Sequence, residues 1–260
     1  MGSPRRALPA PAVAVVVSDI HGIRVNRRAF DCALDAISKI RPDAIWDLGD
    51  HQDGACFNAH PPAPGDRKIT VRQEGENSRA LYRDLRDAGG RTVKQLLALE
   101  GNHDYRYLRW LETECPAKMR DSFPETVDGF VGASKEGFTW VDRNRQWPFF
   151  VGDLGLFHGQ WYNKHHAAKH ADELGVNCIY GHTHRPQQFT RRSAGGVITA
   201  TGVPCLRQLE REWEHMNQKA STGWANGFAV VCFEGTRVSS VSNVIIENGR
   251  AAWGGMSFRG

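Results

Sequence analysis

Five short polar motifs, each placed directly after an apolar run, constrain the fold of this chain more than any other feature. Buried β-strands are predicted for the apolar runs at residues 13–18, 43–48, 93–99, 154–157 and 176–180. Open α/β sheets place their sites at the carboxyl ends of the strands, so we expect the motifs to meet there. In chain order they are Asp19-Ile20-His21, Gly49-Asp50-His51-Gln52-Asp53, Gly101-Asn102-His103-Asp104, His158-Gly159 and Gly181-His182-Thr183-His184.

Helical periodicity separates the predicted strands. Apolar residues recur at Phe30, Leu34, Ile37 and Ile40, which predicts a helix over residues 27–40. The opening strand–helix–strand order predicts parallel strands joined by a right-handed crossover, so the chain is expected to be an α/β protein. Further helices are predicted over residues 77–88, 105–114 and 163–174, and β-rich segments over 197–201, 228–233 and 238–246.

The length and composition fit a soluble protein with one large core. Of the 260 residues, 40% are hydrophobic and 24% are charged, and we find no repeat and no linker, so a single domain over residues 1–260 is expected. A net charge of +4 suits an anionic substrate. The basic pair Arg5-Arg6 precedes a short β-branched run that continues into Asp19, which favours a core strand over a signal peptide. No apolar stretch approaches the roughly 20 residues of a membrane helix, so we expect a cytoplasmic protein.

Two long segments lack a regular pattern. Residues 51–76 are polar, with a proline-rich stretch at 61–65, and are predicted to form a long loop near the site, either a functional lid or a disordered segment. Residues 116–148 are predicted to form an insertion that shapes the substrate side. The cysteines occur singly, without disulfide or metal-site spacing, and are interpreted as buried free thiols in a reducing compartment. They are Cys32, Cys56, Cys115, Cys178, Cys205 and Cys232.

The order and context of the five motifs resemble the calcineurin-like metallophosphoesterase superfamily, whose members are two-metal enzymes that hydrolyse phosphate esters. The resemblance runs from Asp19 to His184, about two thirds of the chain. It implies a four-layer αββα sandwich with a two-metal site at the ends of the strands. The mixed nitrogen and oxygen donors suit two divalent transition-metal ions, with manganese favoured and iron, zinc and nickel as alternatives.

The resemblance also assigns ligands to each ion. In an extended segment, residues i and i+2 point to the same side, which allows Asp19 and His21 to bind one ion. A carboxylate has two oxygens, so Asp50 can bridge both ions. Two divalent ions against two carboxylates leave roughly two positive charges to attract a phosphate. The first ion is assigned to Asp19, His21, Asp50 and His184, and the second to Asp50, Asn102, His158 and His182.

The implied reaction is attack on phosphorus by a hydroxide that forms from water between the two ions. His103 is not a ligand in the family pattern and is expected to protonate the leaving oxygen or to stabilise the transition state. Asp53 matches the position that orients this histidine. Asp104 is a second carboxylate beside it, and both remain candidates for the orienting role.

Several side chains near the motifs are candidates for substrate binding. His51 either lines the pocket or is structural, and Arg185 is a candidate contact for a substrate phosphate. Trp161, with Tyr162 and Asn163, either walls the pocket or packs in the core.

Two histidines outside the motifs share one face of a predicted helix. His166 and His170 lie four residues apart, which suits a metal site, but a solvated helix face is the favoured interpretation. His60, in the predicted loop, is expected to have no role in the site.

Details of the motifs indicate which branches of the superfamily the chain resembles. Protein Ser/Thr phosphatases normally have Asp-Arg-Gly and Gly-Asn-His-Glu where this chain has Asp53-Gly54-Ala55 and Gly101-Asn102-His103-Asp104, which argues against that branch. The nucleotide-lipid pyrophosphohydrolases share the sequence His182-Thr183-His184-Arg185-Pro186 but usually have arginine at the position of His103. The compact layout resembles the small phosphoesterases of bacteria and phages.

Three functions are weighed. The favoured one is a two-metal phosphoesterase, with a phosphodiester in a nucleotide or nucleic acid ahead of a monoester or a pyrophosphate. A non-catalytic scaffold on the same fold is less favoured, because such relatives usually lose ligands. A nucleic-acid binder without turnover needs clustered basic and aromatic residues, and the basic groups at 143–145 and 191–192 are too sparse. No membrane and no protein partner is inferred.

Overall fold

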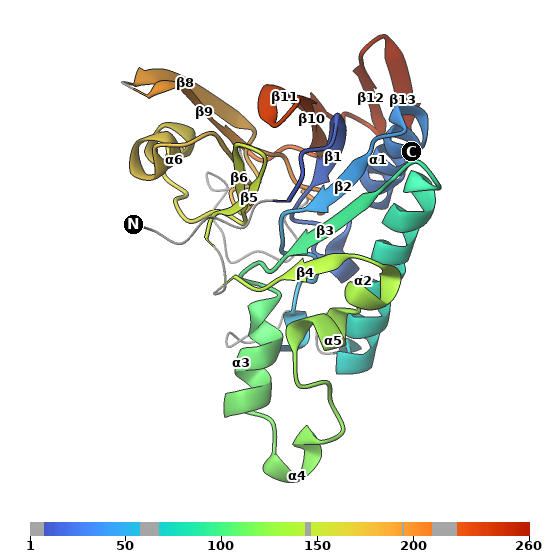
Figure 1. Ribbon diagram of the computed structural model, residues 1–260. Helices are drawn as coiled ribbons and strands as arrows, with labels where there is room; N and C mark the ends of the chain where they lie inside the picture. Colours follow the sequence, from blue (N-terminus) through green and yellow to red (C-terminus); the bar gives the residue numbers. More distant parts are fainter. Residues whose placement is uncertain (1–7, 58–67, 144–146, 194, 210–222) are drawn as a thin grey trace.

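The computed structural model describes residues 8–57, 68–143, 147–193, 195–209 and 223–260. These residues form two mixed β-sheets that pack face to face between helices (Figure 1). No helix in this part of the chain is long and apolar enough to cross a membrane.

The first sheet has six strands in the order β11-β10-β1-β2-β3-β4. The strands from β1 to β4 run parallel, as the opening strand–helix–strand pattern predicts, and β10 and β11 continue the sheet in antiparallel fashion. The bounds are β1 Val13–Val17, β2 Ala44–Asp47, β3 Gln95–Leu99, β4 Thr139–Val141, β10 Gly227–Glu234 and β11 Arg237–Ile245.

The second sheet has five strands in the order β5-β6-β7-β9-β8. Its central strands β6, β7 and β9 are parallel, and β5 and β8 are antiparallel edge strands. The bounds are β5 Phe149–Val151, β6 Leu154–Phe157, β7 Cys178–Tyr180, β8 Gln187–Ser193 and β9 Gly196–Gly202.

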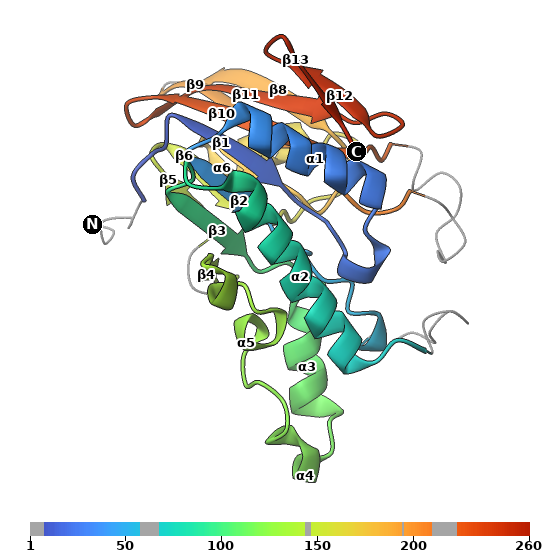
Figure 2. The ribbon, with the colours of Figure 1, turned by 90° about the vertical axis from the view of Figure 1, so that its right-hand side faces the viewer.

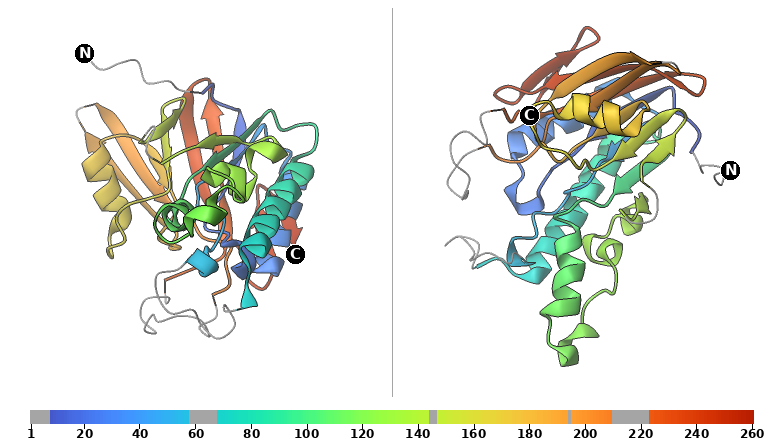
Figure 3. Two further views of the ribbon diagram at one scale, coloured as in Figure 1. Left: turned by 90° about the horizontal axis from the view of Figure 1, so that it is seen from below. Right: turned by 90° about the vertical axis from the view of Figure 1, so that its left-hand side faces the viewer.

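Helices cover the outer faces of both sheets. Helices α1 (Arg27–Ile40) and α2 (Val71–Gly89) lie side by side on the first sheet, and α6 (His166–Leu174) packs on β8 and β9 (Figure 2). The left view of Figure 3 shows the four layers, from α6 through the two sheets to α2. The expected αββα sandwich is therefore confirmed.

The alternation of β1 explains why the sheets stack in this way. Val15 and Val17 point into the core that the first sheet forms with α1 and α2. Ala14 and Val16 point the other way, into a second core shared with strands of the second sheet. Because successive strand residues face opposite sides, a fully apolar strand must be covered on both faces.

The polar segment at 51–76 is more regular than expected. It contains a short 3₁₀ helix, η2 (Ala55–Phe57), and α2 begins at Val71 rather than at residue 77. Thr70 and Gln73 form a reciprocal capping box that fixes this start. The proline-rich stretch at 61–65 and His60 lie outside the described residues.

The segment at 116–148 divides into two parts. In its first part, α4 (Ala117–Arg120) and α5 (Val127–Val131) form, together with the preceding helix α3 (Tyr105–Thr113), an arm that extends below the sheets in Figure 1. The following 3₁₀ helix η4 (Ser134–Glu136) leads into β4, which joins the edge of the first sheet. The segment thus supplies both an excursion and a strand of the main fold.

Candidate metal centre

The predicted ligands come from the ends of strands in both sheets. The first sheet supplies Asp19 and His21 after β1, Asp50 after β2 and Asn102 after β3. The second sheet supplies His158 after β6, and His182 and His184 after β7. Backbone hydrogen bonds connect the first two of these loops, since Asp19 N donates to Gly49 O at 3.0 Å and His21 N to Asp50 O at 3.0 Å.

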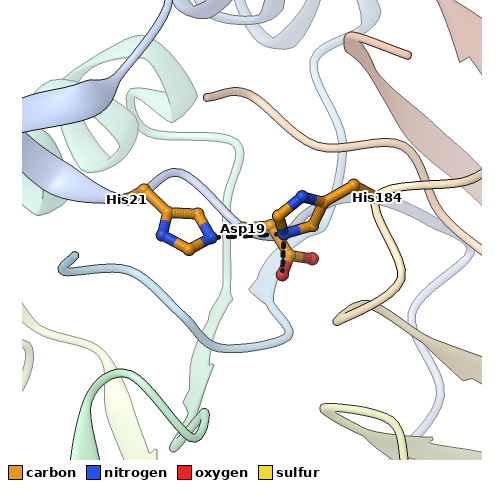
Figure 4. A group of neighbouring side chains, drawn as sticks. All are labelled: Asp19, His21 and His184. Carbon is orange, nitrogen blue, oxygen red and sulfur yellow. Dashed lines mark hydrogen bonds and ion pairs between the residues drawn. The ribbon is translucent and has the colours of Figure 1, made fainter. Parts of the chain in front are cut away.

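Asp19, His21 and His184 form one compact group of donor atoms (Figure 4). Their ligand atoms lie within 4.8 Å of one another. The Nε2 atoms of His21 and His184 are 3.2 Å apart, and His184 Nε2 is 3.1 Å from Asp19 Oδ1. This group contains three of the four ligands expected for the first ion.

A second group forms around Asp50, His158 and His182. His158 Nε2 lies 3.1 Å from Asp50 Oδ2 and 3.0 Å from the amide oxygen of Asn102. Asp50 also groups with His21, on the side of the first set. The Asp50 carboxylate therefore stands between the two groups.

Hydrogen bonds to the ring nitrogens on the far side from the site orient the histidine side chains toward it. His21 Nδ1 is 2.9 Å from Asp53 Oδ1, and His158 Nδ1 donates to Leu48 O at 2.9 Å. Each ring thus keeps its Nε2 for the site, as metal-binding histidines generally do. Asp19 Oδ2 accepts from Ser18 Oγ, whereas the buried Asp19 Oδ1 accepts no hydrogen bond of good geometry and has His184 Nε2 3.1 Å away. A cation between these two atoms would satisfy both of them.

The backbone at the site is strained. Seven non-glycine residues of the described chain have positive φ, and five of them are predicted ligands. Such conformations are rare outside glycine and gather at functional sites. The five are Asp19, His21, Asp50, His182 and His184, with φ between 52° and 67°.

Two motif glycines allow the loops to approach closely. A Cβ atom on Gly181 would lie 1.9 Å from Ser18 Oγ, and one on Gly101 would lie 2.1 Å from Asp50 N. No side chain fits at either position, so these glycines permit the close approach of the ligand loops.

The predicted ligands are buried ionisable groups that shift one another's pKa values. Burial alone would raise the pKa of Asp50. The neighbouring His158 and His103 lower this pKa by more than burial raises it, so it lies well below the usual range. Burial lowers the pKa of His158, but Asp50 and Asp19 reverse this and raise it to about 9. Burial, Arg207 and His103 lower the pKa of His21 to about 3. The carboxylates thus retain a positive charge on His158 that a bound cation would displace.

His103 differs from the ligand histidines because both of its ring nitrogens are engaged. Nδ1 donates to the backbone carbonyl of Asp53 at 2.7 Å, and Nε2 lies 3.0 Å from the guanidinium of Arg106. The carboxylate of Asp53 is 3.9 Å from His103 Nδ1 and instead binds His21 and Arg24. The main chain of Asp53 therefore orients His103, and its side chain orients His21.

Asp104 is a structural tie between two motif loops. It is fully buried and accepts from the backbone N–H groups of Gly101 at 2.9 Å and Gln52 at 3.0 Å. Burial and the nearby Asp50 raise its pKa to about 6. Since its carboxylate is committed to the main chain, it is not the group that orients His103.

The expectation that His51 lines the pocket is wrong. The side chain is fully buried and its ring stacks on Tyr82 with centroids 3.5 Å apart. Its nitrogens bond to Asp47 Oδ2 at 2.7 Å and Ser78 O at 2.9 Å. These contacts hold the His51 side chain between Asp47 and α2, away from the predicted metal ligands.

Trp161 and Arg185 lie at the periphery of the site. The Trp161 ring packs edge-on to His170 at 4.8 Å and lies 6.4 Å from Trp147, while Tyr162 next to it is exposed. Arg185 follows the ligand His184 and is half-buried, with its side chain against Gly223.

His166 and His170 form neither a metal site nor a solvated face. Both are buried: His166 Nδ1 lies 2.6 Å from the Tyr180 hydroxyl, and the His170 ring stacks on Tyr180 at 3.8 Å. His170 Nε2 accepts from the backbone N–H groups of residues 160 and 161 at 3.3 and 3.4 Å. His170 therefore supports the loop that begins at His158. The i,i+4 spacing of the two histidines can be read from the sequence, but their hydrogen-bond partners cannot.

Two further residues near the centre were missed. Arg106 holds His103 and the Asp53 carbonyl, and its place three residues after His103 on a predicted helix was a readable signal. Trp224 lies 4.3 Å from the ring of His184 and 5.1 Å from the Arg207 guanidinium, and nothing in the sequence marks it.

A cavity of about 370 Å³ opens beside the second group. Asn102, His158 and His182 bound it at the metal centre, and Glu100, Arg143 and Trp147 bound it farther out. An anion held at the centre would therefore have space for an attached group on this side.

Comparison with known proteins agrees with this geometry. A family model described as calcineurin-like phosphoesterase matches residues 13–186, more than half of the chain. No curated protein sequence matches.

Several solved structures resemble the fold at low sequence identity. A single mutant of Vps29 from Entamoeba histolytica has 12% identity and a TM-score of 0.44, over 92% of this chain and 96% of that chain. The phosphoesterase Yfce from E. coli has 14% identity and a TM-score of 0.40, over 88% and 98%. The nuclease MPE from Pseudomonas putida has 15% identity and a TM-score of 0.35, over 86% and 85%. The family match establishes that the chain belongs to the calcineurin-like metallophosphoesterases, a family of hydrolases that bind two metal ions and act on phosphate esters.

Proposed function

We propose that this chain, as one domain, is a two-metal phosphoesterase that prefers phosphodiesters in nucleotides or nucleic acid. The observation that carries the proposal is the position of Asp50, which groups with His21 on one side and with His158 and His182 on the other. One carboxylate shared between two sets of donors suits two cations held a few ångströms apart. Manganese is the first choice of metal, with iron, zinc and nickel as alternatives.

The proposed ligand set is divided between the two ions. The donors are imidazole nitrogens, carboxylates and one amide oxygen, which suit divalent transition metals. Asp19, His21, Asp50 and His184 would hold the first ion, and Asp50, Asn102, His158 and His182 the second.

In the proposed reaction, the bound ions supply Lewis acidity to the phosphate and to the attacking water. His103 would protonate the leaving oxygen. The Asp53 carbonyl fixes its Nδ1 as the donor, so Nε2 is the atom that can carry a proton to that oxygen. Arg106 donates to the same Nε2 and would turn to the phosphate oxygens when substrate binds.

The preference for a diester is supported by the surroundings of the centre. A diester carries two groups on its phosphate, and each needs space. Trp147 stands on the cavity beside His158 and His182, and Trp224 lies beside His184 with Arg207 behind it. Aromatic rings and arginines on both sides of a phosphate site suit nucleotides. Arg185, next to His184, is a further candidate contact for the phosphate.

Two other functions are less well supported. A monoesterase or pyrophosphohydrolase would use the same centre but needs no ring-lined space on two sides. A non-catalytic scaffold would not need the oriented His103 or the strained ligand backbone. The six cysteines are free thiols, which supports a reducing compartment such as the cytoplasm.

The test is an assay on protein reconstituted separately with each of the four metals. Hydrolysis of bis-p-nitrophenyl phosphate is compared with that of p-nitrophenyl phosphate, followed by a panel of nucleic acids. We expect metal-dependent turnover with a higher kcat/KM on the diester. Equal or better turnover of the monoester would reject the diester preference, and no turnover with any metal would favour the scaffold.

A further inference from the structure

The cavity beside the second group has walls suited to a flat ring. Trp147 is 47% exposed, and its indole is braced edge-on by Phe157 at 5.5 Å and by Trp161 at 6.4 Å. Phe157 also lines the cavity. A half-exposed tryptophan that other aromatic rings hold in place is a platform on which a planar group can stack.

The cavity also contains a polar group away from the metal centre. Glu100 lines it and is only 5% exposed. No hydrogen bond to its carboxyl is found in the described part of the chain. The Glu100 carboxyl group therefore keeps acceptor capacity that a ligand in the cavity can use for a hydrogen bond.

The size and charge of the cavity exclude other occupants. Its volume of about 370 Å³ is near the lower end for ligand pockets, enough for one small ring system. Its described lining has the carboxyl groups of Glu100 and Asp142 and one guanidinium, that of Arg143, so it offers no excess of positive side chains for a second phosphate. An alkyl chain would leave the Glu100 carboxyl unpaired, whereas the edge of a nucleobase carries N–H donors that can meet it.

We propose that this cavity is a nucleobase subsite, in which the base of a nucleotide ester stacks on Trp147 and bonds to Glu100 through its polar edge. The inference rests on the proposed phosphoesterase function and names its substrate as a nucleoside ester. The phosphate would lie at Asn102, His158 and His182, at the inner end of the same cavity.

The experiment compares three diesters with the same leaving group on the metal-loaded enzyme: the p-nitrophenyl phosphates of thymidine (5′), methanol and hexanol. Stacking on an aromatic side chain corresponds to roughly 5- to 150-fold in affinity, so kcat/KM for the nucleoside ester should exceed that for the methyl ester by about 10-fold or more. The hexyl ester should show no such advantage. If kcat/KM for the hexyl ester equals that for the nucleoside ester, the cavity selects apolar groups in general, and the proposal is overturned.

Variants connect the effect to the cavity. Trp147→Ala should reduce the ratio of nucleoside to methyl ester to about one, and Trp147→Phe should retain part of it. Glu100→Gln, which keeps the shape, should change the relative kcat/KM among the 5′-p-nitrophenyl phosphates of the four deoxynucleosides by about threefold or more. Phe189→Ala removes an exposed ring from β8 and should leave every ratio unchanged. If Trp147→Ala keeps the full ratio, the subsite is elsewhere.

A binding measurement separates the two proposals. Saturation-transfer NMR with adenosine, which has no phosphate, should show contact with the wild-type protein and much weaker contact with Trp147→Ala. If no ester is hydrolysed but this difference is found, the phosphoesterase proposal fails and the base site stands. If the methyl ester is hydrolysed but adenosine does not bind, the reverse holds.

Discussion

Asp50→Asn should weaken both metal ions together. The substitution keeps the size of the side chain and an oxygen that can accept from His103 N, which is 2.7 Å from Asp50 Oδ1. It removes the negative charge that both groups of donor atoms share. An amide nitrogen would also face His158 in place of the carboxylate oxygen.

The size of the effect follows from the geometry. Ligand atoms in each group lie within 4.8 Å of one another, and we use this distance for the separation between the Asp50 charge and either ion. At that separation and an effective dielectric constant of about 20, a unit charge and a divalent ion attract by roughly 7 kcal/mol. If solvent and the other ligands recover two thirds of this, about 2 kcal/mol per ion remains, or about a 30-fold loss of affinity.

The assay is equilibrium dialysis against manganese with elemental analysis of the protein, alongside circular dichroism to confirm folding. Asp121→Asn, which neutralises an exposed carboxylate at the end of α4, is the matched control and should bind as the wild type does. Loss of one ion with unchanged affinity for the other would refute the shared role of Asp50. Wild-type affinity for both would refute its role as a ligand.

Three further predictions concern the residues around the ligands. His103→Ala should keep both metals and slow turnover by roughly 10²–10⁴-fold, with a larger deficit on alkoxide than on p-nitrophenolate leaving groups; an equal deficit would indicate charge stabilisation instead. Gly181→Ala should displace Ser18 and weaken metal binding at the first group, because the new Cβ would lie 1.9 Å from Ser18 Oγ; unchanged metal titration would contradict this. His170→Phe should lower the free energy of unfolding by about 1–3 kcal/mol in urea titrations, because two backbone donors lose their acceptor. Burial lowers the pKa of His170 to about 4. The unfolded chain therefore binds more protons than the folded protein between pH 6.5 and 4, and the free energy of unfolding falls as the pH falls through this range. If His170→Phe shows the same pH dependence as the wild type, other groups cause this slope.

The sequence was most informative where local patterns and tertiary contacts agree. β1 is apolar on both faces, and its strand pattern persists because both faces are covered. α1 has a helical stripe of buried apolar residues and an Asn26 cap. The motifs follow the strands that deliver them, so the donor set could be listed from sequence and family resemblance together.

Other elements were invisible for physical reasons. β8 has the polar sequence of residues 187–193 and lies at a sheet edge, and the hairpin of β12 (Arg250–Trp253) and β13 (Met256–Arg259) is largely exposed. β8 shows no clean alternation of apolar and polar residues, and the two strands of the hairpin do alternate but have only four residues each. The first turns of α2 are polar, and only the capping box at Thr70 marks them.

The same limit applies within the site. Asp19, His21 and Asp50 lie beyond the ends of their strands with positive φ, so strand alternation does not fix the directions of their side chains or that of His51. The division of Asp53, with its carbonyl on His103 and its carboxylate on His21, could not have been predicted either, because both groups belong to one residue. The three-dimensional arrangement decides which group of Asp53 meets which histidine.

The most direct test of the central claim is an anomalous difference map from crystals of this protein grown with manganese. The account predicts two peaks per chain, one among Asp19, His21 and His184 and one among Asn102, His158 and His182, with the Asp50 carboxylate between them. A single peak, or two peaks that Asp50 does not bridge, would contradict it.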